Sequence, residues 1–472
     1  MLKRAAAIGL HAILIIGLIG FFGFRGNISR SEAAESSIAA SAYSPRFTGE
    51  LEHGVTIRVL ENDTAIQQGY FEELIDAFNA AYAEQGIKAV DANMDQYLDL
   101  ENDGPYGYGP DVLYQANDVL MKYVDGNHIL ALPPDALEAW EQIPASAWEA
   151  YQAQGGIYGV PVNIQAPVLY YRSDMIPDNW RDEWDGDKNG VPDMLESWGA
   201  MYRFSRGIRE GNPAAYGYMK SLWDPYFALG YLFSYGGYIF GEDTYDIGLS
   251  AGDAAIGAGV IRQLASVMNE DCIDDTVTKN GYAKLASGEY FAVMTTPDVY
   301  TLFTKEFNLA GTPVDNLGVA AVPALPADGD LSGPGAELIP FKVMGGVNGY
   351  AVSSYTKAPN ACLAFVNFAS GYDMMLRRNA LLGIVPARAD AASEAGGLSE
   401  MVNKKLADNE IVIMPSVRAL AQVWTPAGTL FSDIAKDPYR PQGEMKYTEA
   451  AAFQEGLEKA GQQIYDAIHT LQ

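Results

Sequence analysis

A short acidic segment carries the most specific chemistry in the sequence. Residues 185 to 196 read Asp-Gly-Asp-Lys-Asn-Gly-Val-Pro-Asp-Met-Leu-Glu, which fits the pattern D-x-[DN]-x-[DN]-G-x5-E. Loops of this kind surround a calcium ion with oxygen ligands and turn sharply at the glycine in position six. We therefore predict one structural Ca2+ ion, held by Asp185, Asp187, Asn189, the carbonyl of Val191, Asp193 and Glu196.

The same loop is unsuited to a calcium sensor. Pro192 at position eight lacks the backbone N–H through which paired loops join, and the sequence contains no second loop. Residues 180–184 and 194–208 are expected to be helical, so an ion here fixes the angle between two helices. The alternative is a solvated acidic turn that holds no ion.

Sequence patterns typical of catalysis are missing. The four histidines are scattered, no HExxH or GxSxG occurs, and no GxxxxGK phosphate loop is present. Among 60 acidic residues, spacing alone singles out no pair for glycoside hydrolysis. These observations favour a binding protein over an enzyme, with a secreted or anchored glycan-active enzyme as the alternative.

Aromatic side chains are plentiful, with 29 tyrosines and 7 tryptophans. Sugars offer C–H faces that stack on aromatic rings, and hydroxyls that pair with amides and carboxylates. Most of these rings are expected in the core, and a minority in a ligand cleft. The composition favours a hydroxyl-rich ligand, although a non-sugar solute such as a polyamine or a metal chelate stays open.

Length and charge restrict the function further. A chain of 472 residues exceeds one compact core of ordinary size, so two lobes are expected. The net charge is −29, which excludes nucleic acid as a partner because its binding needs a basic surface. The charge also disfavours adsorption to anionic membranes.

The N-terminal segment has the pattern of an export signal. Lys3 and Arg4 precede an apolar run over residues 5–24, roughly 20 residues, which is long for a signal and just sufficient to span a bilayer. Residues 1–33 are therefore interpreted as a signal peptide or an uncleaved membrane anchor, and residues 34–50 as a flexible spacer. An extracytoplasmic location is expected. Because no cysteine lies near residue 30, a lipoprotein anchor is excluded.

The two cysteines do not define a disulfide by themselves. Cys362 lies in an apolar stretch with helical character, where a buried free thiol is ordinary. Cys272 is far away in the sequence, and export would permit a pair. Both possibilities stay open at this level.

Hydrophobic spacing predicts an alternation of strands and helices. Residues 55–59 alternate between apolar and polar, as a strand does. Short apolar runs at 112–114, 168–170 and 291–294 predict buried strands. A helical face follows the first strand, with apolar residues spaced by three and four: Phe71, Leu74, Ile75, Phe78 and Tyr82. Such an alternation is typical of an α/β architecture.

The order of several short segments resembles the maltodextrin-binding family of bacterial solute-binding proteins, family 1 of the extracellular binding proteins. The resemblance runs from about Val55 to the C-terminus. It rests on Gly109–Leu113, Gly156–Pro161, Tyr170–Asp174, the turn from Ala286 to Met294, and Gly345–Val352 followed by Ala358–Phe368. No single segment is specific for this family, but the order and spacing of the segments together are.

This resemblance implies a ligand cleft between two lobes. The residues that match it are Asn62, Asp63, Gln67, Gln115, Asn117, Asp118, Gln165, Asp224, Tyr226, Asp298, Tyr300 and Trp424. Tyr226 and Trp424 match positions that stack on sugar, whereas Trp223 has no counterpart and is a candidate core residue. Gln115 and Val119 replace a tryptophan and an arginine of the maltodextrin binders, which puts maltose itself in doubt.

The expected fold is therefore a two-lobed α/β periplasmic-binding-protein fold, each lobe a central sheet flanked by helices. The first lobe is predicted over residues 51–165 and 322–387, and the second over 166–321 and 388–472. By the resemblance, such a monomer closes around a mono- or oligosaccharide. It then delivers the sugar to the permease subunits of an ABC importer and catalyses nothing.

Overall fold

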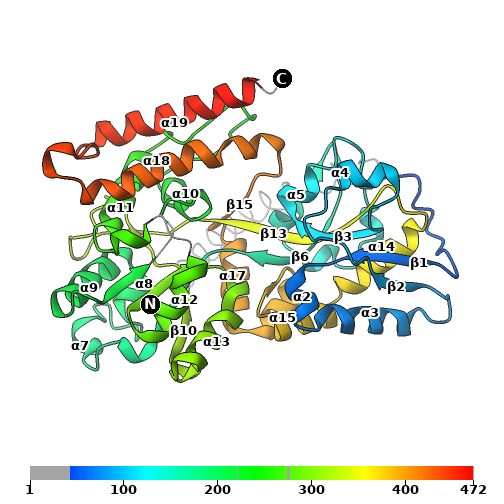
Figure 1. Cartoon of the computed structure of the whole chain (residues 1–472), viewed down its shortest axis with the longest axis horizontal. Helices are drawn as coiled ribbons and strands as arrows, with labels where there is room; N and C mark the ends of the chain where they lie inside the picture. The colour runs from blue at the N-terminus through cyan, green and yellow to red at the C-terminus, as the bar shows by residue number, and fades with distance from the viewer. Residues whose placement is uncertain (1–42, 220–221, 274–276, 471–472) are drawn as a thin grey trace, which may run out of the picture.

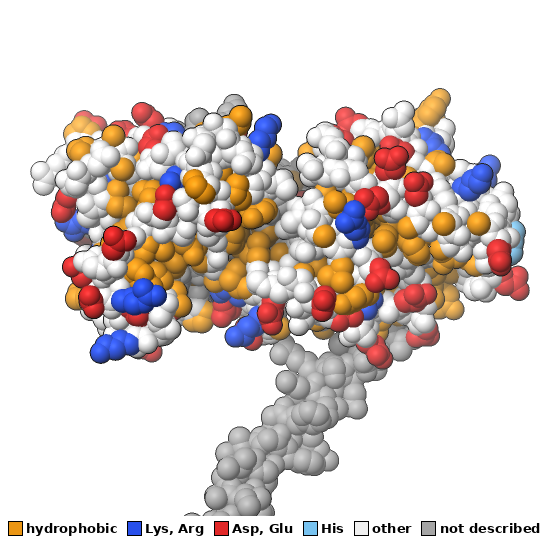
Figure 2. Space-filling view, turned by 90° about the horizontal axis from the view of Figure 1, so that it is seen from below, with side chains coloured by type: hydrophobic (Ala, Val, Ile, Leu, Met, Phe, Trp, Pro, Cys, Tyr) orange, Lys and Arg blue, Asp and Glu red, His pale blue; other side chains and the backbone are white. Residues whose placement is uncertain are grey.

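Two lobes, each built on one sheet, make up the protein. The computed structural model describes residues 43–219, 222–273 and 277–470. The lobes lie side by side, with helices around each sheet and strands passing between them (Figure 1). A space-filling view shows a notch between the two rounded masses (Figure 2). The predicted two-lobed α/β fold is confirmed.

The first lobe contains a seven-stranded sheet in the order β14-β6-β13-β3-β1-β2, with β15 also paired to β13. Strand β1 is parallel to β2 and to β3, and β13 is antiparallel to β3 and β6. The strands are β1 (Thr56–Leu60), β2 (Lys88–Asp91), β3 (Val112–Ala116), β6 (Val160–Gln165), β13 (Val343–Val352), β14 (Val385–Pro386) and β15 (Ile411–Ile413).

Helices pack on this sheet through faces whose apolar residues are spaced by three and four. Helix α3 (Tyr70–Ala81) buries Phe71, Leu74 and Phe78, and its Ile75 is partly buried against the core. The ring of Phe78 packs edge-on against Phe365 of α14 (Pro359–Ala369), with centroids 5.1 Å apart. The other helices around this sheet include α2 (Asp63–Gln67), α5 (Asn117–Met121), α14 (Pro359–Ala369), α15 (Tyr372–Leu382), α16 (Ala389–Ala395) and α17 (Gly397–Ala407).

The second lobe contains a four-stranded sheet in the order β10-β7-β9-β8. Its strands are β10 (Leu317–Ala320), β7 (Val168–Arg172), β9 (Tyr290–Thr295) and β8 (Tyr216–Met219). Strand β9 is buried along its whole length. The helices include α9 (Trp198–Gly211), α10 (Pro225–Ser234), α11 (Ala254–Ala265), α12 (Val277–Ser287), α13 (Tyr300–Ala310), α18 (Trp424–Lys436) and α19 (Ala450–Thr470), the last two running side by side (Figure 1).

The chain returns to the first lobe later than the predicted residue 322. Residues 322–341 pack on the second lobe, where Ala324 N donates to Glu196 O at 2.7 Å and Trp198 N donates to Ala324 O at 2.9 Å. The return falls at β13, which starts at Val343. The Pro- and Gly-rich composition at 322–335 marks a loop, but a loop does not reveal which lobe it lies on.

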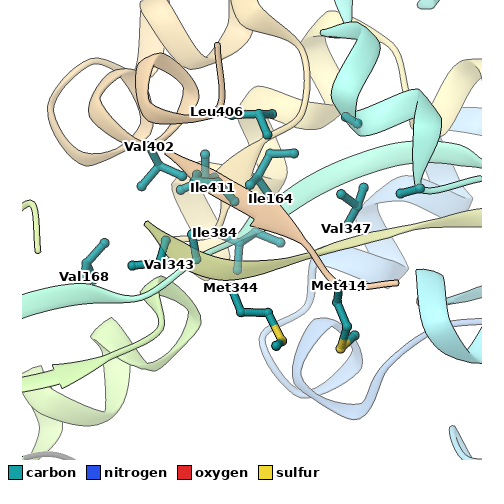
Figure 3. Close-up of a cluster of buried hydrophobic side chains, with 14 of the residues drawn as sticks. Ile164, Val168, Val343, Met344, Val347, Ile384, Val402, Leu406, Ile411 and Met414 are labelled. Carbon is teal, nitrogen blue, oxygen red and sulfur yellow. The ribbon is translucent and has the colours of Figure 1, made fainter. Parts of the chain in front are cut away.

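The last crossing is also later than the predicted residue 388. Strand β15 pairs in parallel with β13, Val343 opposite Ile411, and Asn379 of α15 donates to Ser399 of α17 at 3.0 Å. Buried side chains from these segments meet in one apolar cluster that includes Ile164, Val402 and Ile411 (Figure 3). Residues 389–413 therefore belong with the first sheet, and the chain crosses between β15 and α18.

The predicted spacer ends before residue 50. Phe47 is buried, Ser44 N donates to Ala131 O at 3.0 Å, and Thr48 N donates to Asn360 Oδ1 at 3.1 Å, so these residues are part of the first lobe. The signal or anchor segment 1–33 lies outside the described residues. Over the described ranges, no helix is both long enough and apolar enough to cross a membrane.

The two cysteines are free and buried. Cys362 lies on α14, where its thiol is 3.4 Å from Thr356 Oγ1. Cys272 lies in the second lobe, 3.1 Å from the hydroxyl of Tyr290. Each thiol has a hydroxyl neighbour in its own lobe, so the open question of a disulfide is answered by two separate thiols.

A fully buried ion pair stands at the carboxyl end of β1. Arg378 of α15 donates to both carboxylate oxygens of Glu61, at 2.8 and 3.0 Å, and the side chains are 1% and 0% exposed. The Tyr350 hydroxyl also bonds to Glu61. The guanidinium carbon lies 4.0 Å from the ring centroid of Tyr114 and 4.8 Å from that of Tyr70. The pair thus joins β1, β3, β13 and α15.

Replacing Arg378 by methionine is expected to lower the free energy of unfolding by about 3–5 kcal/mol, because it leaves the Glu61 charge buried and unpaired. The neighbouring Arg377 pairs with Glu73 at 2.6 Å, but both side chains are about half exposed, at 45% and 47%. Arg377→Met should therefore cost less than about 1 kcal/mol. Urea unfolding followed by circular dichroism measures both, and equal losses would contradict the assignment.

Candidate functional site

The first-lobe side of the site is set by the parallel pairing of β1 with β2 and β3. Carboxyl ends of parallel strands meet at one edge of a sheet, where ligands of open α/β sheets bind. The loop after β1 presents Asn62 and Asp63, and the segment after β3 presents Asn117 and Asp118. The candidates from these two loops therefore lie at one edge of the first sheet.

Gln96, in the loop after β2, links two of the candidates. Its amide accepts from Asp63 N at 3.2 Å and donates to Asp63 Oδ2 at 3.4 Å. Its carbonyl accepts from Gln115 Nε2 at 2.7 Å. Gln115 Oε1 is buried with no hydrogen-bond partner among the described residues. Gln96 was not predicted from the sequence. The only signal for Gln96 is that it follows β2, which pairs in parallel with β1.

Two other first-lobe candidates use their polar groups within the protein, and a third is exposed. Asn62 caps α2 by accepting from Ala65 N at 2.8 Å. Asn117 is fully buried and bonded at both ends of its amide, to Val347 N at 3.1 Å and to Met414 O at 3.0 Å. Gln67 is exposed at the end of α2. Asn117 therefore joins β3, β13 and the last crossing, which is a structural role. Gln67 is four residues after Asp63 on α2, so the two side chains share one face of this helix.

Candidates from both lobes converge on Tyr226. Its hydroxyl donates to the carbonyl of Gln165 at 3.2 Å, at the end of β6 where the chain leaves the first lobe. Burial raises the pKa of the Tyr226 phenol, and the nearby carboxylates of Asp298, Asp224 and Asp118 raise it further. Asp118 belongs to the first lobe, and the other two carboxylates belong to the second. The site therefore lies between the lobes.

Two of these carboxylates are only partly compensated. Burial raises the pKa of Asp298 despite hydrogen bonds from Thr296 and from its own backbone. Its Oδ1 atom is buried and has no partner in the described part of the chain. Burial also raises the pKa of Asp118, against the effect of backbone N–H groups and of Lys122. Such oxygens are acceptors for the donor groups of a ligand.

The second lobe supplies aromatic rings beside these carboxylates. Trp424, at the start of α18, lines a cavity of about 980 Å³ together with Trp223, Asp224 and Pro225; the rest of the lining comes from α18, α19 and the segment between them, so the cavity is formed by the second lobe alone. Asp224 caps α10 by accepting from Tyr226 N at 3.0 Å. Trp223, a candidate core residue in the sequence, lines the same cavity, and its indole Nε1 is buried without a partner among the described residues.

Tyr300 lies at the junction of the lobes, away from that cavity. It begins α13, and its ring centroid is 6.4 Å from that of Tyr170. A Cβ atom added at Gly383, just after α15, would be 3.6 Å from Tyr300 Cβ. This contact places Tyr300 against the first lobe, opposite the end of α15.

The acidic loop at 185–196 has the backbone form that its pattern predicted. Gly190 adopts φ +86° at the sharp turn, and Asp193 N donates to Trp184 O at 2.6 Å, which closes the loop between α7 (Trp180–Glu183) and α8 (Asp193–Glu196). Carboxylate oxygens of Asp187, Asp193 and Glu196 lie within 4.8 Å of one another.

Charge repulsion inside this loop is partly relieved by Asn189. Its amide nitrogen donates to Asp187 at 3.0 Å and to Glu196 at 2.8 Å. Burial raises the pKa of Glu196, and the negative charges of Asp187, Asp193 and Asp185 raise it further. Clustered carboxylate oxygens are the ligands that a hard cation prefers, so the residues present fit a calcium ion.

The two lobes, with polar and aromatic groups from each meeting at their junction, define a two-domain binding protein. The profile of the bacterial extracellular solute-binding protein family matches residues 63–375, and the chain belongs to this family. Its members bind solutes outside the cytoplasm, which confirms the predictions of a binding protein rather than an enzyme and of an extracytoplasmic location.

Relatives cover most of the chain. The maltodextrin-binding protein MdxE of Bacillus subtilis (strain 168) is 25% identical over 77% of this chain and 83% of its own. The galactooligosaccharide-binding protein of the same organism is 22% identical over 74% and 77%. The maltose-binding periplasmic protein MalE of Listeria monocytogenes, solved with maltose, aligns over 88% of this chain and 98% of its own with a TM-score of 0.67 and 20% identity.

The uncompensated charge at Asp298 makes a prediction about stability. Because the pKa of this carboxyl is raised in the folded protein, the folded state binds its proton more tightly than the unfolded state. Stability from this group is therefore present below the ordinary aspartate pKa of about 3.9 and lost as the pH rises through the raised value. Asp298→Asn should raise the melting temperature of the ligand-free protein at pH 7.

The gain from Asp298→Asn should shrink as the pH is lowered toward about 4, since the wild-type carboxyl is then protonated. Differential scanning calorimetry at several pH values measures it. Asp76→Asn, at an exposed position on α3, serves as a matched control with no expected gain. A variant at position 298 that is no more stable than the wild type at pH 7 would contradict the prediction.

Proposed function

We propose that this protein captures a sugar or oligosaccharide between its two lobes and delivers it to the permease subunits of an ABC importer. The observation that carries the proposal is the contact at the junction of the lobes: Tyr226 of the second lobe donates to Gln165 of the first lobe at 3.2 Å, and its neighbours Trp223 and Asp224 line a cavity together with Trp424. The charges of Asp118 on the first lobe and of Asp224 and Asp298 on the second raise the pKa of the Tyr226 phenol, in addition to its burial. Carboxylates and a peptide carbonyl accept from sugar hydroxyls, and indole rings stack on their C–H faces.

The relatives support the same ligand class. Their names describe binding of maltodextrin, galactooligosaccharide and maltooligosaccharide. The different sugars in these names leave the identity of this protein's sugar to experiment. We further propose that the protein acts as a monomer and that its N-terminal segment directs export as a signal peptide or holds the protein at the membrane.

Capture is proposed to proceed by closure of the lobes. Three segments connect them, between β6 and β7, before β13, and between β15 and α18. A ligand shifts the balance toward the closed form only by the extra contacts that it makes there. Asp118 on one lobe and Asp298 on the other supply such contacts, since a sugar bridging them satisfies acceptors from both lobes.

Truncation of the ring that lines the cavity tests the ligand class. Trp424→Ala is expected to weaken binding by about 1–3 kcal/mol, which is roughly a 5- to 150-fold rise in Kd. A thermal-shift screen of neutral gluco- and galacto-oligosaccharides identifies the sugar, and titration calorimetry then measures its Kd. Tyr465→Ala, on the outer part of α19, is the control and should bind as the wild type does.

A wild-type protein that binds no sugar of the panel, or a folded Trp424→Ala variant with unchanged affinity, would contradict the proposal. Binding of a polyamine or a metal chelate in the same screen would support a non-sugar solute instead. Calorimetric heat from repeated cleavage of the oligosaccharide would support catalysis.

We also propose that residues 185–196 hold one structural calcium ion. The ligands would be the side chains of Asp185, Asp187, Asn189, Asp193 and Glu196 and the carbonyl of Val191. When bound, the cation neutralises the crowded carboxylates and fixes α7 relative to α8. The loop is also joined to the rest of the second lobe, because the Glu196 carbonyl accepts from Ala324 N at 2.7 Å.

Calcium is expected to raise the free energy of unfolding by about 2.7 kcal/mol when its free concentration is one hundred times Kd. The melting temperature should therefore rise with the logarithm of the free calcium concentration. Chelation should reverse the rise. Glu196→Gln should abolish the response, whereas Asp182→Asn, an exposed acid on the adjacent α7, should keep it. Melting curves that coincide in chelator and in excess calcium would show that the segment is only an acidic turn.

A further inference from the structure

The loop after β2 carries an aromatic ring at the ligand-binding edge of the first lobe. Strand β2 is parallel to β1 and adjacent to it, Val59 opposite Asp91, so this loop leaves the same edge as Asn62 and Asp63. Tyr97 lies in it. Its side chain is 83% exposed, the largest fraction among the exposed large hydrophobic side chains in the described parts of the chain.

The backbone on both sides of Tyr97 is fixed. Before it, Gln96 is bonded to Asp63 and to Gln115 at 3.2 and 2.7 Å. After it, the carbonyl of Leu98 accepts from the Tyr123 hydroxyl at 3.1 Å. Tyr97 N itself donates to Asp95 Oδ1 at 2.8 Å. The loop is therefore held in place from the inside, and the ring that it presents projects from a rigid base.

The position of this ring complements the rest of the cleft. The first-lobe candidates bonded to its loop, Asp63 and Gln115, are polar, whereas the tryptophans that line the cavity come from the second lobe. A pyranose ring held between the lobes has two faces, and polar groups satisfy only its hydroxyls. A single exposed ring is ordinary on a protein surface. What sets Tyr97 apart is its place directly beside Gln96, the residue that joins two cleft candidates.

We propose that Tyr97 is the first-lobe aromatic platform of the cleft and stacks on a pyranose ring of the bound sugar. This inference rests on the proposed sugar-binding function. The contact is made through the ring and not through the hydroxyl, so a phenylalanine serves equally well. Because the base of the loop is already fixed, binding orders only the side chain, which keeps the entropic cost small.

The chain offers matched controls for the test. Tyr106 and Tyr108 are also tyrosines of the first lobe and are 78% and 68% exposed. They lie just before β3, at its amino end, which is the opposite edge of the sheet. Alanine at either position removes a similar exposed ring from a place where no sugar is expected.

Titration calorimetry with the sugar identified for the wild type is the deciding experiment. Tyr97→Ala should raise Kd by roughly 5- to 50-fold without a change in melting temperature. Tyr97→Phe, Tyr106→Ala and Tyr108→Ala should bind within about twofold of the wild type, which is the size of a surface change that touches no ligand. Upfield shifts of sugar C–H protons in NMR spectra should persist in Tyr97→Phe and decrease in Tyr97→Ala.

If Tyr97→Ala binds the sugar as tightly as the wild type while Trp424→Ala does not, the proposal that Tyr97 stacks on the sugar is wrong and the sugar-binding function stands. If Tyr97→Phe loses as much affinity as Tyr97→Ala, the hydroxyl makes the contact and the stacking proposal is overturned. If the wild type binds no sugar, both proposals are overturned together.

Discussion

The buried pair of Glu61 and Arg378 is the constraint around which the first lobe is arranged. Burying two charges is costly unless they are paired and hydrogen-bonded. Here both Glu61 oxygens are bonded to Arg378, and Glu61 also accepts from Asn62 N at 2.9 Å, while Arg378 Nε is buried without a hydrogen-bond partner among the described residues. The ion pair therefore fixes the start of the loop that presents Asn62 and Asp63, because Asn62 N is bonded to Glu61. Asp63 of the same loop bonds to Gln96, the residue before Tyr97, so hydrogen bonds connect the ion pair to both loops.

At the junction of the lobes, buried charges are left only partly compensated. In the core, the Glu61 charge is fully compensated, whereas Asp298 keeps a buried oxygen without a partner among the described residues and Asp118 is only weakly compensated. Such groups lower the stability of the ligand-free protein. Acceptors left free in this way are available to ligand donors without first breaking a bond inside the protein. A cost in stability at this place is therefore consistent with a function in binding.

Local patterns in the sequence predicted local structure well. The spacing of Phe71, Leu74 and Phe78 defines α3, and Gly190 turns the acidic loop where the pattern requires it. The lobe boundaries were misplaced because they depend on partners distant in the sequence: Ala324 is held by Glu196 and Trp198, and Ile411 by Val343. Asn117 was a candidate because the family resemblance implied it, yet its amide oxygen accepts from Val347 N of β13. Gln96 and Tyr97 became visible only once the parallel register of β1 and β2 was known.

The position of Tyr226 couples the ligand site to the connection between the lobes. Its backbone is fixed by the Asp224 cap of α10 in the second lobe, while its hydroxyl donates to Gln165 O at the end of β6. Gln165 lies directly before the crossing to β7 and pairs with Gly346 of β13, another strand next to a crossing. The Tyr226–Gln165 bond therefore joins the second lobe to the first directly beside a crossing. A ligand that contacts Tyr226 acts on a bond that already spans the moving parts, and this is the differential interaction that closure requires.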